Sequence, residues 1–253
     1  MGATLVVGGL ARAFGAVRAV DGVSLQVQAG HVHSLIGPNG AGKTTVFNCI
    51  SGFLRPDAGH VRLDGRDVTG WAPHRLVGAG LARTFQITKV FGELAVLENV
   101  ALASRSRRGR NLDVWRRAAD VVDAHAEAEE ILETLGLADR AALRAEQLGH
   151  GDKRVLEVAI ALALRPTVLL LDEPTAGMSS AETERIGAVI RRLAARTSVL
   201  LVEHDTEMVL GISDEVTVMT QGRVIAHGPP EAISRDPQVQ DAYLGGVDAG
   251  TLS

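Results

Sequence analysis

Two kinds of hydrophobic pattern divide the chain. Near its start, apolar and polar residues alternate over residues 4–7 and 23–27, which predicts strands with one buried face. Farther along, residues 167–171 and 198–202 are almost entirely apolar, which is typical of short strands buried on both faces in a parallel sheet. We therefore predict an antiparallel β layer combined with an α/β core.

A helical block interrupts this pattern. Apolar residues recur at helical spacing over residues 113–135, with Gly136 placed to end that helix, and again over residues 152–164. Because residues 99–164 stand between core strands, we interpret them as an inserted helical subdomain. The basic stretch at residues 104–110 is predicted to be a solvated loop, with contact to anionic lipid headgroups or a partner subunit as the alternative.

The rest of the chain continues the α/β pattern. Ser179 and Glu182 have the spacing of a capping box, which predicts the start of a helix. Residues 216–219 and 223–226 are apolar segments on either side of a Gln-Gly pair, and they predict a hairpin. From about residue 229 the chain is predicted to be a mostly helical tail.

Composition limits the classes of protein that fit. With 46% apolar residues among 253, the chain can form a sizeable core, and a net charge of −4 argues against a dedicated nucleic-acid binder. We find no signal peptide, and the longest apolar run, residues 158–164, is far shorter than the roughly 20 residues of a membrane span. Cys49 is the single cysteine, which excludes an internal disulfide and suggests a soluble protein of a reducing compartment.

One segment matches the pattern of a phosphate-binding loop, in which a glycine-rich turn leads into Gly-Lys-Thr. Residues 32–36 ahead of it predict a strand, and residues 43–51 after it predict a helix that Gly52 ends. This order is the context that the motif requires, so a purely structural turn is the weaker interpretation. The residues of the loop are Gly37, Pro38, Asn39, Gly40, Ala41, Gly42, Lys43, Thr44 and Thr45.

The residue types of this loop suit a polyanion. Its glycines allow a tight turn whose backbone N–H groups point inward, next to a helix N-terminus that favours negative charge. Lys43 adds a positive charge for the β- and γ-phosphates of a nucleotide, and the Thr44 hydroxyl suits Mg²⁺.

Five further residues are candidates for the same site. Asp172 ends an apolar strand, where its carboxylate would hold Mg²⁺, and Glu173 would polarise the attacking water, although an ordinary strand-end turn is the alternative. His204 follows the next core strand and is either structural or beside the phosphate. Gln86 offers an amide to Mg²⁺ and water, but spacing alone does not distinguish it from any other loop glutamine. Phe14, in a polar loop, either stacks on a flat base such as adenine or is an ordinary surface or core residue.

At this point the motifs match a family. The sequence resembles the ATP-binding subunits of ABC transporters across almost its whole length, in six segments that occur in the family's order. The resemblance implies an α/β fold: a P-loop NTPase core with a mostly parallel sheet, an antiparallel β subdomain and an inserted helical subdomain. The segments are GPNGAGKT at 37–44, TFQ at 84–86, LGHGD at 148–152, LLLDEP at 169–174, AGMS at 176–179 and VEHD at 202–205.

The resemblance also implies functional roles. Phe14 is expected on adenine, Gln86 in a loop facing the membrane subunit, Glu173 as catalytic base and His204 as switch histidine. ATP and Mg²⁺ are the expected ligands, with Thr44, Gln86 and Asp172 toward the metal. Residues 4–247 are expected to form one ATP-binding domain. Its parts are an antiparallel β and nucleotide core at about 4–86 and 166–228, a helical subdomain at about 87–165 and a helical tail at about 229–247.

Within the family, the chain is most similar to the branched-chain amino-acid, or Liv-type, subgroup. The segments that carry this similarity are GPNGAGKTTVFNCISGF, RTFQITKVFGELAVLENV, LLVEHD with MVLGISDEVTVMTQG, and the terminal AYLG. The subgroup implies import of branched-chain or other hydrophobic amino acids, with this chain as a peripheral subunit at the cytoplasmic face of the inner (plasma) membrane. The implied partners are a second ATP-binding subunit, two integral-membrane permeases and an extracytoplasmic substrate-binding protein, with no nucleic acid.

The signature segment departs from the family's usual LSGGQ. Here it consists of Leu148, Gly149, His150, Gly151 and Asp152, and the family places it against the ATP of the partner subunit. Gly149 lacks the expected hydroxyl, and Asp152 brings a negative charge where a neutral amide is usual. We therefore expect a heterodimer, in which a partner supplies a full signature to the ATP held by this chain.

Two other functions remain as alternatives. The first is a soluble ABC ATPase that acts on nucleic acid or ribosomes, although this chain has one cassette, no long coiled-coil insertion and no basic surplus. The second is a nucleotide-binding regulatory subunit with low turnover, which the altered signature suggests.

Overall fold

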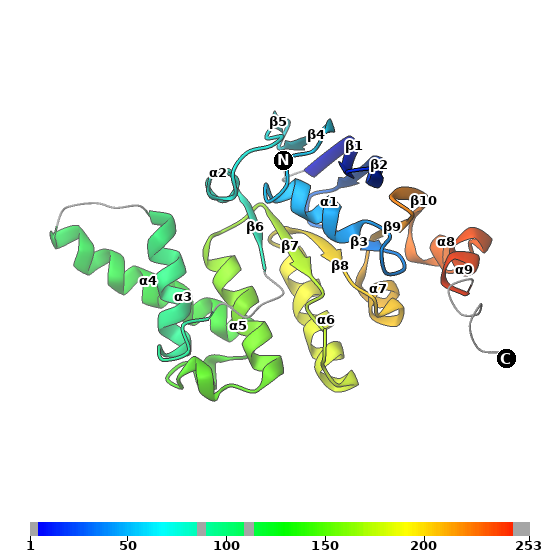
Figure 1. Cartoon of the computed structure of the whole chain (residues 1–253). Coiled ribbons are helices and arrows are strands. Elements are labelled where there is room, and N and C mark those ends of the chain that lie inside the picture. The colour runs from blue at the N-terminus through cyan, green and yellow to red at the C-terminus, as the bar shows by residue number, and fades with distance from the viewer. Residues whose placement is uncertain (1–4, 85–89, 109–113, 245–253) are drawn as a thin grey trace.

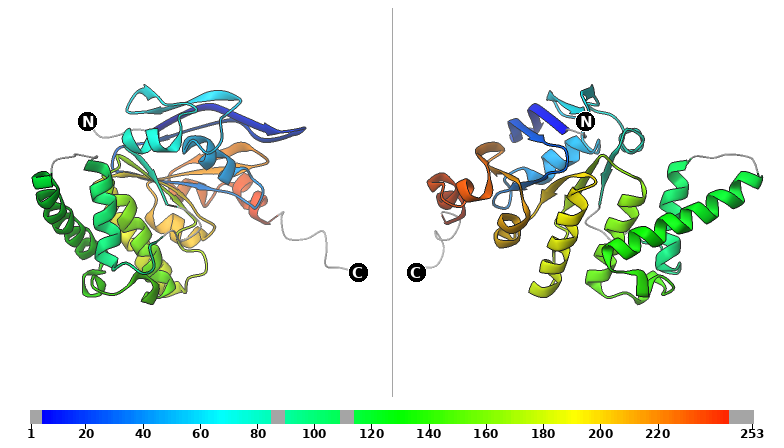
Figure 2. Two further views of the ribbon diagram at one scale, coloured as in Figure 1. Left: turned by 60° about the vertical axis from the view of Figure 1, so that its left-hand side comes forward. Right: turned by 180° about the vertical axis from the view of Figure 1, so that it is seen from behind.

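The structure is a computed structural model that describes residues 5–84, 90–108 and 114–244. Two β-sheets and their helices form the described part of the chain (Figure 1). The antiparallel sheet and α1 (Lys43–Ile50) lie over one face of the larger sheet, and α6 (Ser180–Ala194) lies against the other. Figure 2 shows the same layers from two further sides, with the helices of the insert beside one edge of the larger sheet.

The larger sheet has six strands in the order β10-β9-β3-β8-β7-β6, parallel from β9 to β6, with β10 antiparallel to β9. Every residue of β3, β7 and β8 is buried, which confirms the prediction of strands covered on both faces. The β9–β10 hairpin is also confirmed. The strands are β3 (Val32–Ile36), β6 (Leu81–Arg83), β7 (Val168–Asp172), β8 (Ser198–Val202), β9 (Glu215–Thr220) and β10 (Arg223–Gly228).

The smaller sheet is antiparallel, with the order β2-β1-β4-β5. Its apolar residues, such as Leu5, Val23 and Val61, share a core with Phe47 and Ile50 of α1 and with one face of the larger sheet. This core fixes the phosphate-loop helix between the two sheets. The strands are β1 (Leu5–Phe14), β2 (Val17–Val27), β4 (Ala58–Leu63) and β5 (Arg66–Asp67).

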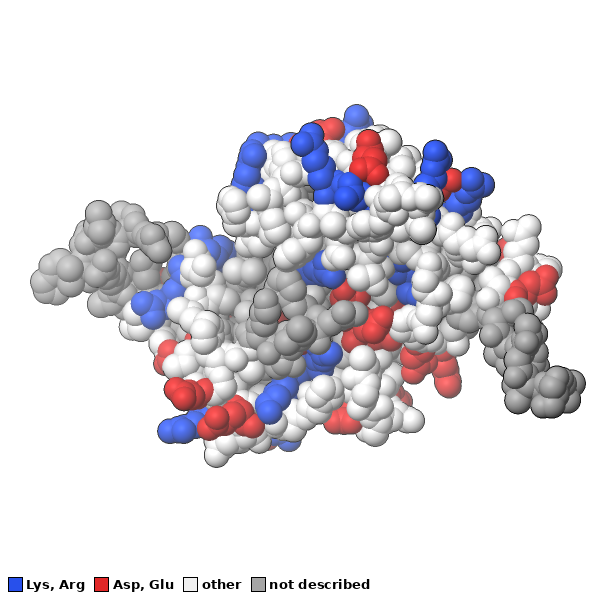
Figure 3. All heavy atoms as spheres, viewed as in Figure 1, with Lys and Arg blue, Asp and Glu red and all other residues white. Residues whose placement is uncertain are grey.

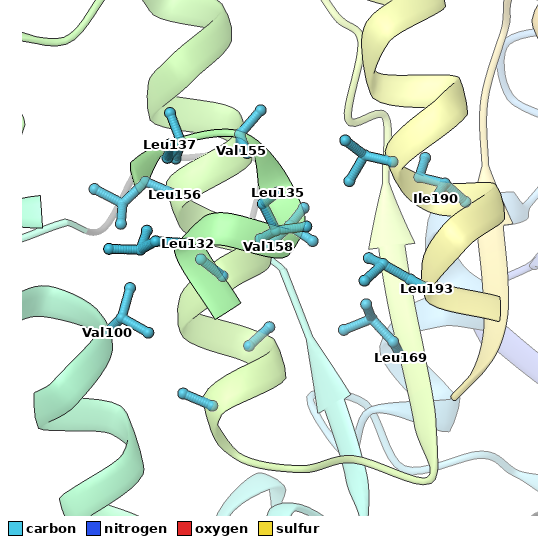
Figure 4. Close-up of a cluster of buried hydrophobic side chains, with 14 of the residues drawn as sticks. Val100, Leu132, Leu135, Leu137, Val155, Leu156, Val158, Leu169, Ile190 and Leu193 are labelled. Atoms are coloured by element: carbon cyan, nitrogen blue, oxygen red, sulfur yellow. The ribbon is translucent and has the colours of Figure 1, made fainter. Parts of the chain in front are cut away.

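Among the described residues between β6 and β7 there are three helices, α3 (Val96–Arg108), α4 (Val114–Leu135) and α5 (His150–Ala163), with 3₁₀ turns at Ala138–Arg140 and Ala145–Gln147. Their apolar side chains join those of β7 and α6 in a second core (Figure 4). Gly136 has φ +70 and ends α4, as its position in the sequence predicted. The helical insert of the fold class is therefore confirmed, while the bounds given above for the core, insert and tail stay a prediction.

The remaining helices complete the surface: α2 (Pro73–Gly78), α7 (Thr206–Ile212), α8 (Pro230–Ile233) and α9 (Pro237–Leu244). The Glu182 carboxylate accepts hydrogen bonds from the backbone N–H and the hydroxyl of Ser179 at the start of α6, as the capping-box spacing predicted. In the described residues, none of the helices combines the length and apolar character that crossing a bilayer requires.

The interpretation of residues 104–110 as a loop is wrong for Ser104–Arg108, which form the last turns of α3. Ser104 is fully buried and donates a hydrogen bond to Glu127 of α4, and Arg107 pairs with the same carboxylate. Val100, Ala101 and Ser104 continue one buried helical face, so tertiary packing outweighs the local charge. Residues 109 and 110 lie outside the described residues.

Candidate nucleotide-binding site

The phosphate loop connects β3 to α1 at the carboxyl edge of the parallel strands. Gly37, Gly40 and Gly42 have φ angles of 150, 80 and 100. Positive φ at Gly40 and Gly42 is a conformation that few other residues adopt without strain. The glycine spacing of the sequence motif therefore matches the backbone that the loop adopts.

Two of these glycines also allow close packing of the backbone. A Cβ at Gly37 would lie 2.1 Å from the carbonyl oxygen of Met219, and one at Gly42 would lie 2.3 Å from that of Ala19. Strands β9 and β2 thus hold the loop from two sides, and any larger residue at either position would displace it.

Lys43 is the first residue of α1 and is 5% exposed. Its ammonium donates to the carbonyl oxygens of Gly37 at 2.6 Å and Pro38 at 3.0 Å, so it holds the loop closed around its own side chain. Burial lowers the pKa of Lys43, and the nearby charges of Glu173 and Asp172 oppose that shift. Thr44, next along, is exposed, and its hydroxyl is available to a ligand.

The acidic pair follows β7. The side chain of Asp172 is fully buried, and its Oδ2 accepts a hydrogen bond from Arg83 at 2.6 Å. Its other oxygen, Oδ1, is also buried and has no hydrogen-bond partner among the described residues. An orphaned carboxylate oxygen in a dry site is costly unless a ligand completes it.

Glu173 and His204 meet at the ends of neighbouring strands. The Glu173 Oε1 accepts a hydrogen bond from His204 Nε2 at 2.7 Å, and the backbone N–H of Glu173 donates to Val202 at the end of β8. Glu173 has φ 47, a left-handed conformation in which a non-glycine residue stores strain, and such strain is frequent at functional sites. The sequence placed both residues at this edge, and the structure brings their side chains into contact.

Glu203 supports this pair, although the sequence motifs assigned it no role. It is 3% exposed, and its carboxylate accepts from the N–H and hydroxyl of Thr175 and from the N–H of His204. Glu203 thereby joins the segment after β7 to the segment after β8. A charged residue directly after an almost entirely apolar strand was the signal available in the sequence.

The predicted nucleotide contacts of Phe14 and Gln86 are not tested by the described residues. Phe14 is not in a loop, because it ends β1 and pairs with Val17. Phe14 is 48% exposed, and the Arg12 guanidinium carbon lies 5.2 Å from the centroid of its ring. No interaction described in the structure links Phe14 to the phosphate loop. Gln86 lies outside the described residues, so both roles stay predictions.

The signature segment begins α5. Gly149 is the N-cap residue, and the exposed His150 donates through Nε2 to the carbonyl oxygen of Ala176 at 3.2 Å. Asp152 is not a free charge: Arg140 and Arg185 both donate to its carboxylate. The expected repulsion between Asp152 and a phosphate is therefore weakened, because two guanidinium groups compensate its charge.

Comparisons with known proteins agree with this arrangement. A family model described as "ABC transporter" matches residues 20–176, which include the phosphate loop, the signature segment and the acidic pair. The chain belongs to the ABC transporter family. A second model, described as "Branched-chain amino acid ATP-binding cassette transporter", matches residues 223–249 of this cassette. As a member of that family, the chain is an ATP-binding ATPase.

Relatives match the cassette from end to end. It is 41% identical over 250 residues to the high-affinity branched-chain amino acid transport ATP-binding protein BraF of Pseudomonas aeruginosa, a match that covers 95% of this chain and 97% of BraF. The corresponding LivG protein of Escherichia coli K12 is 40% identical over 250 residues, with 95% and 97% covered. The structure superposes with a TM-score of 0.84 on the crystal structure of the ADP conformation of an ABC transporter's ATP-binding cassette, at 31% identity over 97% of this chain and 100% of that one.

Proposed function

We propose that this cassette is the ATP-hydrolysing subunit of an importer for branched-chain or other hydrophobic amino acids. The observation that carries the proposal is the match of residues 223–249 to the branched-chain cassette model, at the end of a chain whose relatives BraF and LivG match over 95% of its length. A generic cassette would account for the core but not for this C-terminal match.

ATP binding is assigned to the phosphate loop, residues 37–45, with Lys43 toward the β- and γ-phosphates. The residues fit Mg²⁺, because the Thr44 hydroxyl is exposed and Asp172 Oδ1 is a buried oxygen without a partner among the described residues. When bound, the metal would neutralise charge on the phosphate oxygens. Gln86 is proposed as a further metal contact and Phe14 as the residue that stacks on adenine.

For hydrolysis, Glu173 is proposed as the general base that orients water and accepts its proton. His204 donates to the same carboxylate at 2.7 Å, so it fixes the direction in which Glu173 points. Because an ionised carboxylate only accepts hydrogen bonds, the proton of this pair belongs to His204 Nε2. Glu203 holds the backbone of both segments in this arrangement.

The proposed assembly contains a second ATP-binding subunit, two integral-membrane permeases and an extracytoplasmic binding protein, with the cassette at the cytoplasmic face of the membrane. Residues 148–152 would face the partner's ATP, and their contacts within this chain leave His150 exposed. The proposal of a heterodimer is supported by the missing hydroxyl at Gly149 and by the resemblance to the subgroup. Asp152 does not support it, because Arg140 and Arg185 compensate its charge.

An uptake experiment tests the proposal. Deletion of the gene in its own host should lower uptake of labelled leucine, isoleucine and valine, and the wild-type gene but not a Glu173→Gln variant should restore it. Unchanged uptake of all three in the deletion strain would contradict the proposed substrate class.

A purification from the same host tests the partners. Two apolar membrane proteins and a second cassette are expected with the tagged chain. Recovery of ribosomes or RNA instead would favour the alternative of a soluble ABC ATPase that acts on nucleic acid or ribosomes. The surface does not favour that alternative, because basic and acidic side chains are mixed over the face in Figure 3 and basic side chains do not cover it.

A further inference from the structure

Arg83 connects three elements around the site, namely β6, β7 and α1. It lies at the end of β6, and its side chain is 10% exposed. One terminal nitrogen, Nη2, donates to Asp172 Oδ2 at 2.6 Å, and the other, Nη1, donates to Asn48 Oδ1 and Ser51 Oγ at 2.7 Å each. The guanidinium therefore joins the end of β7 to the phosphate-loop helix α1.

Two aromatic rings hold the guanidinium in place. Its central carbon lies 5.7 Å from the ring centroid of Phe47 in α1 and 5.6 Å from that of Phe53, just after the helix. These distances are in the range of cation–π attraction. A planar group with two directed donors and two aromatic contacts has little freedom to rotate, so the position of Asp172 relative to α1 is fixed.

The spacing along α1 links this contact to the metal. Thr44, Asn48 and Ser51 are separated by four and three residues, so they lie on one face of the helix. Arg83 thus binds the helical face whose first turn presents the Thr44 hydroxyl. It also occupies only Oδ2 of Asp172 and leaves Oδ1, buried and without a partner among the described residues, for another ligand.

We propose that Arg83 is a positioning residue for Mg²⁺: it holds Asp172 at a fixed distance and orientation from Thr44, so that both oxygen ligands are set before the nucleotide binds. The inference rests on the proposed roles of Thr44 and Asp172 as metal ligands. Groups that orient a ligand commonly change metal affinity by about 10- to 100-fold when they are removed.

The test measures affinity for the non-hydrolysable ATP analogue AMP-PNP by calorimetry, once in EDTA and once in excess Mg²⁺, with the full chain. In the Arg83→Gln and Arg83→Lys variants, the gain in affinity from Mg²⁺ should fall at least about tenfold, whereas affinity in EDTA should change less than about twofold. Lysine keeps the charge but lacks the planar fork that reaches Asp172, Asn48 and Ser51 together. Asn48→Ala, which removes one acceptor, should give a smaller loss of the same kind.

Arg107→Lys is the matched control, because Arg107 also pairs with a largely buried carboxylate, Glu127, but in the helical insert. It should leave the Mg²⁺ dependence unchanged, and urea unfolding of each variant checks that the chain is folded. If both Arg83 variants kept the wild-type ratio of AMP-PNP affinity in Mg²⁺ to that in EDTA, the inference would be overturned. Equal losses of affinity in EDTA and in Mg²⁺, together with a lower unfolding midpoint, would also overturn it, because Arg83 would then only stabilise the fold. If the wild type itself showed no binding, the proposed function would fail along with the inference.

Discussion

At the scale of single residues, the structure changes the expected role of Lys43. The sequence predicts a charge for phosphate at the junction of loop and helix, but the side chain is buried and its ammonium donates to two carbonyls of the loop itself. The residue types at the site could be predicted from the motif, whereas these contacts could not, since they depend on how the loop folds back. Lys43 therefore stabilises the shape of the loop, in addition to the contact with phosphate that we propose for it.

Lys43→Ala is predicted to weaken ATP binding by about 10- to 100-fold, because it removes charge-assisted hydrogen bonds to phosphate. It should also lower the free energy of unfolding by about 1 kcal/mol through the lost bonds to the loop. Calorimetric titration with ATP and urea unfolding of the apo protein measure the two effects separately. Wild-type ATP affinity in this variant would remove Lys43 from the site.

A second residue-scale prediction concerns His33, on the strand that enters the loop. His33 is fully buried, and its Nε2 shares a hydrogen bond with the Thr217 hydroxyl. The titratable groups near its ring are those of Glu215, His227 and His31. Burial, with a smaller effect of His227, lowers the pKa of His33 from 6.5 to about 4. Because the unfolded chain binds the proton first, stability should fall as pH drops from about 6.5 toward 4.

The expected loss from His33 is about 1–3 kcal/mol between pH 7.5 and 4.5. Urea unfolding of the wild type and of His33→Gln at both pH values isolates this contribution from other titrating groups. The variant should lose less stability than the wild type over the interval. Parallel losses in the two proteins would assign the acid sensitivity to other residues.

At the scale of elements, the hydrophobic patterns predicted the core strands and helices α4 and α5, and in β7, β8 and α5 the burial follows the pattern of the sequence. They failed at Ser104–Arg108, where a polar and basic sequence continues a helix that packs on Glu127. The sequence also did not predict that Arg140 and Arg185 compensate the charge of Asp152. In both cases the partners come from elements distant in sequence, which a local pattern does not contain.

Asp152 gives the element-scale prediction. Its negative charge lies in the first turn of α5, where it stabilises the helix N-terminus, and its carboxylate accepts hydrogen bonds from Arg140 and Arg185. Asp152→Ala should therefore lower the free energy of unfolding by about 1–3 kcal/mol, with a smaller loss in high salt. The exposed Asp139 in the adjacent 3₁₀ turn supplies the control, since Asp139→Ala should change stability by less than about 0.5 kcal/mol. Equal effects of the two variants would contradict the role of the arginine pair.

At the scale of the whole molecule, the sheet order places the three parts of the site together. Strand β8 lies between β3 and β7, so His204 stands between the phosphate loop and the acidic pair. The antiparallel sheet covers α1 from one side, and the helical insert carries the signature segment at the start of α5, where His150 contacts Ala176 after β7. The fold class was predictable from motif order, but the order of strands, and with it the contact of Glu173 with His204, was not.

The most direct measurement is ATP turnover by the Glu173→Gln variant. Phosphate release is measured at saturating Mg²⁺ and ATP, in the purified transporter complex, beside ATP binding by the same preparation. Because an amide cannot accept the proton of water, turnover should fall by about 100- to 10,000-fold while ATP affinity stays within about twofold of the wild type. Turnover at the wild-type rate would contradict the assignment of Glu173 as the base and, with it, the account of how this site hydrolyses ATP.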